Sequence, residues 1–209
     1  MLKVLVCDDH PIVREGLKQL LGDDPLIGKI GEAASGNEAL AKLQAEPWDV
    51  FVLDLMLPDR HGLDVLKQAK CYQPDVPVLV LTMHAEDQYA VRALKAGAAA
   101  YLTKESAPEQ LREAVHKVVS GGRYVSPSLA EKVLLAWGDQ GEAPLHAVLS
   151  DREFEILCLL ASGKTVTEIA HTLGVSVKTV STYRTRMLEK MEMKTTADLI
   201  AYAIRGGLV

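Results

Sequence analysis

Acidic side chains follow two apolar runs of the chain, at the points where the runs end. Asp8 and Asp9 come directly after the run 2–7, and Asp54 comes directly after the run 50–53. If these runs are neighbouring parallel strands, their carboxyl ends open on one crevice, where the three carboxylates would meet. Hard cations such as Mg²⁺ are usually held by one or two carboxylates together with phosphate oxygens. The spacing therefore predicts a magnesium site that serves phosphate chemistry.

Thr82 and Lys104 follow two further apolar runs, 78–81 and 100–103. A hydroxyl and an ammonium beside a cation are suited to binding the equatorial oxygens of a phosphoryl group. Any one of these polar residues is as well explained by ordinary capping of a strand end. All five of them at successive strand ends favour a phosphoryl-binding site.

The elements that must position these residues alternate regularly over the first 120 residues. Five short apolar runs alternate with five helical segments, a pattern typical of a parallel sheet with helices on both faces. Strands are expected at 2–7, 29–34, 50–53, 78–81 and 100–102. Helices are expected at 11–21, 37–45, 63–71, 87–96 and 108–120. The predicted fold class of this part is α/β, with a doubly wound five-stranded parallel sheet.

The remainder of the chain shows only helical signals. Glycine and proline interrupt residues 121–147, which we interpret as a linker that contains one short helix at 129–137. Residues 148–209 contain two capping-box patterns, at Ser150 and at Thr165. Helices are expected at 151–162, 166–173, 177–192 and 196–205. The predicted domains are therefore 1–120, a linker at 121–147, and a small all-α four-helix domain at 148–209.

Two of the later helices have the spacing of a helix-turn-helix, because a three-residue turn containing Gly174 separates them. The apolar stripe of the second helix is expected to pack inside the domain and comprises Val177, Val180, Met187, Leu188 and Met191. Its opposite arc combines cations with hydroxyls, which suits the DNA major groove. Candidate phosphate contacts are Lys178, Thr179, Arg186 and Lys190, and candidate base contacts are Ser181, Thr182 and Thr185. A solvated helix face is the competing interpretation, and the turn spacing with the capping patterns favours DNA binding.

Charge and cysteine usage narrow the class of protein. The formal charge is −5. Residues 1–149 carry 15 Lys/Arg against 21 Asp/Glu, whereas residues 150–209 carry 8 against 7, so a polyanionic partner is expected at the rear segment.

The three cysteines are far apart and in no metal-ligand spacing, which is typical of a reducing cytoplasm. No run is long enough to span a membrane, and no signal-peptide pattern opens the chain. A soluble cytoplasmic protein is expected.

Over nearly its whole length the sequence resembles two-component response regulators of the NarL/FixJ class, in which a receiver domain precedes a LuxR-type helix-turn-helix. The matching receiver residues are Asp8, Asp9, Asp54 within the motif 54–62, Thr82, Tyr101 and Lys104. The matching output motifs are 149–153 and 176–180. The resemblance implies a flavodoxin-like receiver. It also implies that Asp54 accepts a phosphoryl group from a sensor histidine kinase or a phosphotransfer protein.

The resemblance assigns roles to the other site residues as well. It implies that Mg²⁺ is held by Asp9, Asp54 and the backbone carbonyl of Met56, with Asp8 acting mainly through water. Lys104 would pair with the phosphoryl oxygens, and Thr82 would turn its hydroxyl toward them after transfer. Tyr101 is similar to an aromatic switch, although a strand aromatic packed at a sheet edge is an equally good interpretation.

Three functions fit these residues to different degrees. The leading prediction is a transcription factor, not an enzyme, that binds promoter DNA under phosphorylation control, through domain release or as a homodimer. An aspartate-nucleophile phosphohydrolase would normally carry a general-acid Asp two residues after the nucleophile, where this chain has Met56. A DNA-binding protein whose front domain no longer takes phosphate is the third possibility, and the complete set of receiver residues argues against it.

Overall fold

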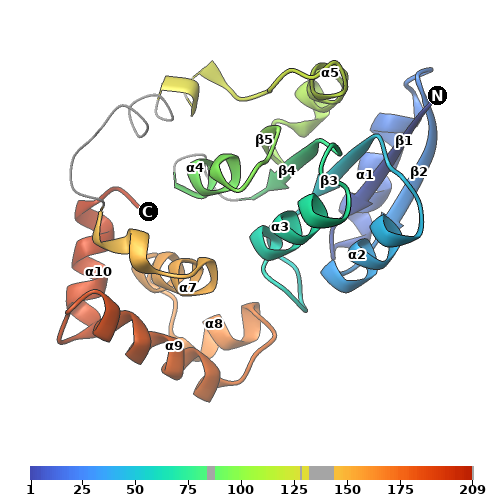
Figure 1. Cartoon of the computed structure of the whole chain (residues 1–209). Helices are drawn as coiled ribbons and strands as arrows, with labels where there is room; N and C mark the ends of the chain where they lie inside the picture. The colour runs from blue at the N-terminus through green and yellow to red at the C-terminus, as the bar shows by residue number, and fades with distance from the viewer. Residues whose placement is uncertain (84–87, 128, 132–143, 209) are drawn as a thin grey trace. The chain divides into compact units, whose positions relative to one another are not determined.

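The structure is a computed structural model that describes residues 1–83, 88–127, 129–131 and 144–208. The chain forms two compact units, Met1–Asp139 and Gln140–Val209 (Figure 1). Each unit is described by itself.

Five parallel strands form the sheet of the first unit, in the order β2-β1-β3-β4-β5 (Figure 1). Their bounds are Leu2–Cys7 for β1, Ile27–Ala33 for β2, Val50–Leu53 for β3, Val78–Thr82 for β4 and Ala100–Thr103 for β5. The predicted doubly wound parallel sheet is therefore confirmed. The chain leaves β1 toward β2 on one side and returns to β3 on the other, so the ends of β1 and β3 flank the switch point of the sheet. Sheets of this kind bind their ligands at that point.

Helices cover both faces of this sheet. Helices α1, Pro11–Gly22, and α5, Ala107–Val119, pack against one apolar face. Helices α2, Gly36–Ala45, α3, Gly62–Tyr72, and α4, Gln88–Lys95, belong to the other face (Figure 1). Every residue of β3 is buried, which agrees with its continuous apolar sequence, because a central parallel strand is covered on both sides. All ten predicted elements of this unit are present, with ends that shift by no more than two residues.

The chain continues along the edge of the sheet after α5. Tyr124 forms a parallel bridge with Ala100 of β5. The backbone N–H of Tyr101 donates to the Tyr124 carbonyl at 3.1 Å, and the Tyr124 N–H donates to the Ala99 carbonyl at 3.0 Å. The first residues of the predicted linker thus pack on the edge strand of the first unit. Most of the predicted linker helix at 129–137 lies outside the described residues.

The second unit is all helical in its described part. It contains a 3-10 helix, η1, at Leu145–Val148, and the helices α7 at Asp151–Ala161, α8 at Val166–Thr172, α9 at Val177–Lys190 and α10 at Thr196–Arg205. Both predicted capping boxes are confirmed, and a third, at Thr195 with Asp198, was not predicted. Gly174 has φ +63°, so the turn before α9 uses a left-handed conformation that glycine adopts at little cost.

The apolar stripe of α9 is confirmed only in part. Val180, Met187 and Met191 are buried, and Leu188 is half-buried. Val177 is 47 % exposed, so its predicted place in the core is wrong. Val177 is the first residue of α9 and lies next to the turn that precedes this helix.

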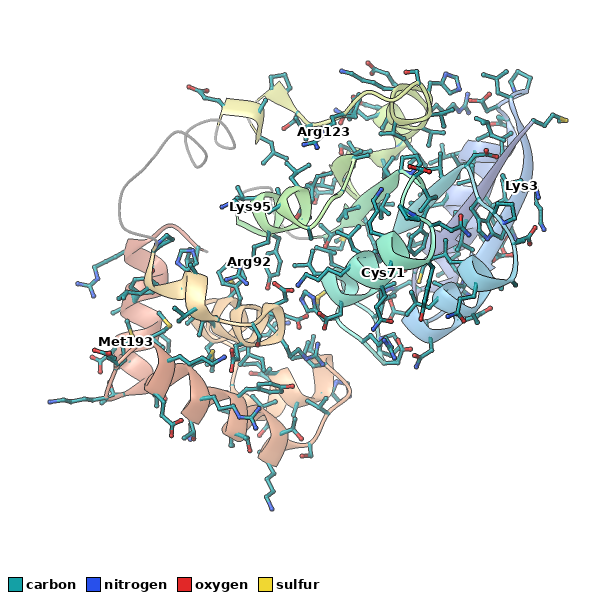
Figure 2. The ribbon with its side chains drawn as sticks, in the orientation of Figure 1. Lys3, Cys71, Arg92, Lys95, Arg123 and Met193 are labelled. Atoms are coloured by element: carbon teal, nitrogen blue, oxygen red, sulfur yellow. The ribbon has the colours of Figure 1, made fainter. Side chains whose placement is uncertain are left out.

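No disulfide joins the three cysteines, which all lie in the described part of the chain. Cys7 and Cys158 are buried, and Cys71 lies exposed near the end of α3 (Figure 2). Of the helices described, none is both long enough and apolar enough to cross a membrane.

Candidate phosphoryl-binding site and DNA-binding surface

The carboxylates predicted to meet at the sheet edge do lie together. Cys7 pairs with Leu53 in the β1–β3 register, and the Asp54 N–H donates to the Cys7 carbonyl at 2.8 Å, which sets Asp8 level with Asp54. Ligand atoms of Asp8, Asp9, His10 and Asp54 all lie within 4.8 Å of one another. The side chains of Asp8 and Asp54 are only 2 % exposed, whereas that of Asp9 is 33 % exposed. The cluster is therefore buried on one side and open to solvent on the other.

Lys104 joins two of these carboxylates. Its Nζ lies 2.6 Å from Asp8 Oδ2 and 2.7 Å from Asp54 Oδ2. Its backbone N–H donates to the Thr82 carbonyl at 2.8 Å, which fixes the start of its side chain at the ends of β4 and β5. The ammonium thus lies beside the carboxylate predicted to accept the phosphoryl group.

Burial and the opposite charge of the partner shift the pKa of each member of this ion pair in opposite directions. Burial raises the pKa of Asp54 from its ordinary value of 3.8 to about 6, and the nearby Lys104 ammonium offsets part of that rise. Burial alone would lower the pKa of Lys104, but Asp54 and Asp8 outweigh it and raise that pKa above 10.5. At neutral pH Lys104 therefore remains an ammonium, and Asp54 is available as a carboxylate nucleophile.

The loop after β3 folds back on itself and holds Asp54 from the other side. The Met56 N–H donates to Asp54 Oδ1 at 3.1 Å. Met56 pairs with His61 in an antiparallel bridge, and the Gly62 N–H donates to the Leu55 carbonyl at 2.9 Å. Asp54 Oδ1 is thus bound by Met56 while Oδ2 faces Lys104.

Thr82 and Tyr101 are both fully buried. The prediction placed Thr82 directly after its strand, whereas in the structure Thr82 is the last residue of β4. Tyr101 of β5 pairs with Val80 of β4. Its assignment as a switch stays a prediction.

Two further residues at this site were not recognised in the sequence. His10 is exposed, and its Nδ1 lies 2.7 Å from Asp9 Oδ1. Arg14, one turn into α1, donates from Nη1 to the Asp8 carbonyl at 2.7 Å. Their spacing from the acidic pair, one and five residues after Asp9, is the signal that could have found them.

The predicted DNA-contact residues lie mainly around the first half of α9. A hollow of about 330 Å³ is lined by Ser176, Lys178, Thr179, Thr182, Tyr183 and Arg186. Ser176 and Tyr183 were not among the predicted contacts. Ser181 and Thr185 lie outside this lining, although Thr185 is exposed and Ser181 half-buried. Thr182 and Thr185 donate their hydroxyl protons to the Lys178 and Ser181 carbonyls at 2.9 and 3.2 Å, so their oxygens remain as acceptors toward a ligand.

Lys190 has a partner inside the domain that the sequence did not predict. Its Nζ lies 2.6 Å from Oε2 of Glu153, a buried residue in the first turn of α7. The same oxygen accepts the Ser150 N–H at 2.8 Å. Lys190 therefore ties the end of α9 to the capped start of α7, while 41 % of its side chain stays exposed. Its use as a DNA phosphate contact stays a prediction.

Known protein families match both the part of the chain with the carboxylate cluster and the part with α9. The response regulator receiver domain model matches residues 4–116, and the model of the luxR family of bacterial regulatory proteins matches residues 147–203. The response regulator UvrY of Escherichia coli (strain K12) is 35 % identical over 100 % of this chain and 96 % of its own length. The response regulator GacA of Pseudomonas aeruginosa is 36 % identical over 100 % of this chain and 98 % of its own length.

Solved structures give the same result. The response regulator RcsB of Salmonella typhimurium is 26 % identical, with a TM-score of 0.62 over 97 % of this chain and 98 % of its own. An RcsB–DNA complex matches with a TM-score of 0.60 at 26 % identity, over 96 % of both chains. Since whole-length relatives, both domain models and the β2-β1-β3-β4-β5 sheet agree, the chain belongs to the two-component response regulators with a LuxR-type DNA-binding domain, the NarL/FixJ class of transcription factors.

Proposed function

We propose that Asp54 is the phospho-acceptor of this response regulator and that its phosphorylation controls promoter binding by the second unit. One observation carries the proposal. The buried Asp54 carboxylate is held between the Met56 N–H and the Lys104 ammonium, within the cluster that also contains Asp8 and Asp9. A nucleophile that is oriented in this way, with cationic charge beside it, suits phosphoryl transfer.

The residues of the cluster also fit a magnesium ion. Three of the cluster's four members, Asp8, Asp9 and Asp54, offer carboxylate oxygens, which are the ligands that Mg²⁺ prefers; the fourth, His10, offers a ring nitrogen. The backbone carbonyl of Met56 would add a further oxygen, and the partial exposure of Asp9 leaves room for water and phosphoryl oxygens. When bound, the cation supplies positive charge to the phosphoryl group and to the carboxylates around it.

In the proposed transfer, an Asp54 carboxylate oxygen attacks the phosphorus of a phosphohistidine on the partner kinase or phosphotransfer protein. The new P–O bond forms as the P–N bond breaks, and the imidazole leaves with the bonding electron pair and takes up a proton. Lys104 exchanges its contact with the Asp54 carboxylate for one with a phosphoryl oxygen. The Thr82 hydroxyl donates to another oxygen. The product adds about −1.5 to −2 charges at this point.

The proposed path to the output begins at β4 and β5. Thr82 and Tyr101 lie on these paired strands, and the Tyr101 N–H is bonded to the Tyr124 carbonyl. A shift of Thr82 toward the phosphoryl group would therefore be transmitted along β5 to the start of the segment that leads to the second unit. We propose that this shift favours domain release or homodimer formation. A structure of two RcsB dimers bound to two parallel DNAs supports a homodimer on DNA for this chain as well.

The second unit is proposed to bind double-stranded promoter DNA through α9, in a protein that acts in the cytoplasm. Lys178, Thr179, Thr182 and Arg186 line one hollow, together with Ser176 and Tyr183. RcsB bound to a promoter in the presence of the phosphomimetic BeF₃⁻ supports this assignment. The cytoplasmic assignment is supported by the three cysteines, none of which forms a disulfide in the structure.

The proposal is tested on the full-length protein with acetyl phosphate and MgCl₂. We expect the intact mass to increase by one phosphoryl group, with the modification at Asp54, and we expect EDTA to prevent it. Promoter binding or self-association should change with the modified fraction. If saturating donor gave no modified protein, or if complete modification left assembly, DNA affinity and transcription unchanged, the proposal would be rejected. Steady turnover of phosphate monoesters would instead favour a phosphohydrolase.

Two variants of α9 should separate phosphate contacts from base contacts. Lys178→Ala is expected to weaken binding to all DNA sequences by roughly five- to tenfold. It should also reduce the slope of log affinity against log salt concentration by about one. Thr182→Ala should change which sequences are preferred, by about 1 kcal/mol at the affected position. Binding is measured by fluorescence anisotropy on promoter and unrelated duplexes at several salt concentrations.

Lys194→Ala is the matched control for Lys178→Ala. It removes the same charge from an exposed site beyond the opposite end of α9, and we expect a smaller effect. Equal losses on every duplex in the Lys178 and Thr182 variants would contradict the division of roles.

A further inference from the structure

Asp59 connects the loop after Asp54 to the first turn of α2. The Gly36 N–H donates to Asp59 Oδ1 at 2.9 Å, and the Asn37 N–H donates to Oδ2 at 2.8 Å. Backbone N–H groups in the first turn of a helix have no partner within the helix, and the helix dipole favours a negative charge there. Both oxygens of Asp59 are therefore used to hold the loop tip against α2.

Arg60 adds a second set of contacts beside the first. Its Nε donates to Asn37 Oδ1 at 2.7 Å, and its Nη1 donates to Gln68 Oε1 at 2.9 Å. Gly36 also lies so close to α3 that a Cβ on it would come within 2.7 Å of Val65 Cγ2. The loop tip is thus fastened to two helices that are themselves closely packed.

The same loop carries Asp54 at its base. Met56 and His61 form the bridge that closes the loop, and Asp59 lies in the connection between them. Across the bridge, the Met56 N–H is bonded to Asp54 Oδ1 at 3.1 Å. A displacement of the tip would therefore be transmitted through the bridge to Met56 and to the orientation of the Asp54 carboxylate.

We propose that Asp59 is a positioning residue for phosphoryl transfer, which clamps residues 55–61 to α2 so that Met56 orients Asp54 and presents its carbonyl to the cation. This inference rests on the proposed function. Asp59 acts through Met56 and touches no reacting atom. It sets how readily the site binds Mg²⁺ rather than how fast the loaded site reacts.

The test compares Asp59→Ala with the native full-length protein in MgCl₂ titrations without phosphodonor, followed by backbone amide NMR shifts. Exchanging an outer partner of a metal ligand typically lowers metal affinity ten- to hundredfold, so we expect half-saturation at about tenfold higher Mg²⁺. The Gly36 and Asn37 amide signals should move, because they lose their acceptor. With acetyl phosphate, the half-saturating Mg²⁺ concentration should rise similarly, while the rate at saturating Mg²⁺ stays within about twofold.

Two further variants separate positioning from loss of charge. Asp59→Asn removes the same charge but keeps one acceptor oxygen, so it should shift Mg²⁺ half-saturation less than Asp59→Ala does, and the difference should persist at high salt, where through-space effects are screened. Asp64→Asn removes a charge from an exposed site in the first turn of α3 and should leave the Mg²⁺ dependence unchanged.

The outcomes are distinguishable. If Asp59→Asn and Asp59→Ala shift the Mg²⁺ half-saturation equally, and the shifts disappear at high salt, simple charge attraction replaces the inference. An unchanged half-saturation in both variants also overturns it. If Asp59→Ala loses its native NMR spectrum, Asp59→Asn is compared with Asp64→Asn, and equal Mg²⁺ dependence of those two variants overturns the inference. In each of these cases labelling of the native protein at Asp54 leaves the proposed function intact. Failure of the native protein to take up phosphate would instead reject that function.

Discussion

Asp54→Asn is expected to abolish phosphorylation completely. The amide lacks the anionic oxygen that attacks phosphorus, and the other carboxylates of the cluster, Asp8 and Asp9, extend from β1 rather than from the loop that holds Asp54. Labelling by acetyl phosphate and MgCl₂ is measured by intact mass, and signal-dependent transcription is measured alongside. Residual labelling at the native level would show that another residue is the acceptor.

The same substitution is expected to stabilise the folded protein in the absence of a cation. Folding raises the pKa of Asp54 from 3.8 to about 6, so the ionised carboxylate opposes folding at neutral pH. A difference of about two pKa units corresponds to at most about 3 kcal/mol. The free-energy cost of burying the ionised Asp54 is absent below pH 3.8, grows as the pH rises from 3.8 to about 6, and is complete above pH 6. The native protein should therefore lose stability relative to Asp54→Asn as the pH rises through this window.

This second effect is measured by urea unfolding in EDTA between pH 4 and 8, within the range where the protein stays folded. Asp64→Asn removes an exposed acid of the same unit and serves as the control, with a change of a few tenths of a kcal/mol expected. A pH dependence identical in the native protein and in Asp54→Asn would contradict the raised pKa. A loss of stability at neutral pH would show that the contact with Lys104 outweighs the cost of burial.

Gly62→Ala is expected to destabilise the first unit by about 3 kcal/mol, at the upper end of the range for overpacked sites. A Cβ at this position would lie within 2.7 Å of the Asp54 carbonyl oxygen and closer still to the Leu55 Cα. Both neighbours are backbone atoms, which cannot move aside as a flexible side chain can. Because this contact closes the loop that orients Asp54, we also expect phosphorylation to slow. Urea unfolding and labelling kinetics measure the two effects.

The matched control for this substitution is Gly16→Ala in the middle of α1. No atom lies within 4 Å of a Cβ added there, and alanine is favoured over glycine inside a helix by about 1 kcal/mol. Gly16→Ala should therefore stabilise the protein while Gly62→Ala destabilises it. Equal stability of the two variants would show that the backbone around Leu55 yields more easily than the structure indicates.

The sequence by itself determined the sheet, the helices and the main carboxylates of the site. Each strand of a parallel sheet ends at the same edge, so Asp8, Asp9, Asp54 and Lys104 could be placed together from their positions after apolar runs. Helix starts at Ser150 and Thr165 were also predictable, because a capping box involves residues only three positions apart. Local periodicity, however, placed Val177 in the core, and the packing of the domain leaves it exposed.

Only the tertiary structure decided which of the remaining polar groups meet. Asp59 binds the start of α2 across 22 and 23 residues, and Lys190 pairs with Glu153 across 37, and neither partner can be identified from spacing along the chain. The raised pKa of Asp54 likewise depends on how completely distant segments exclude water from it. Strand ends and helix caps follow from short-range geometry, whereas burial and long-range pairing exist only once the chain has folded around them.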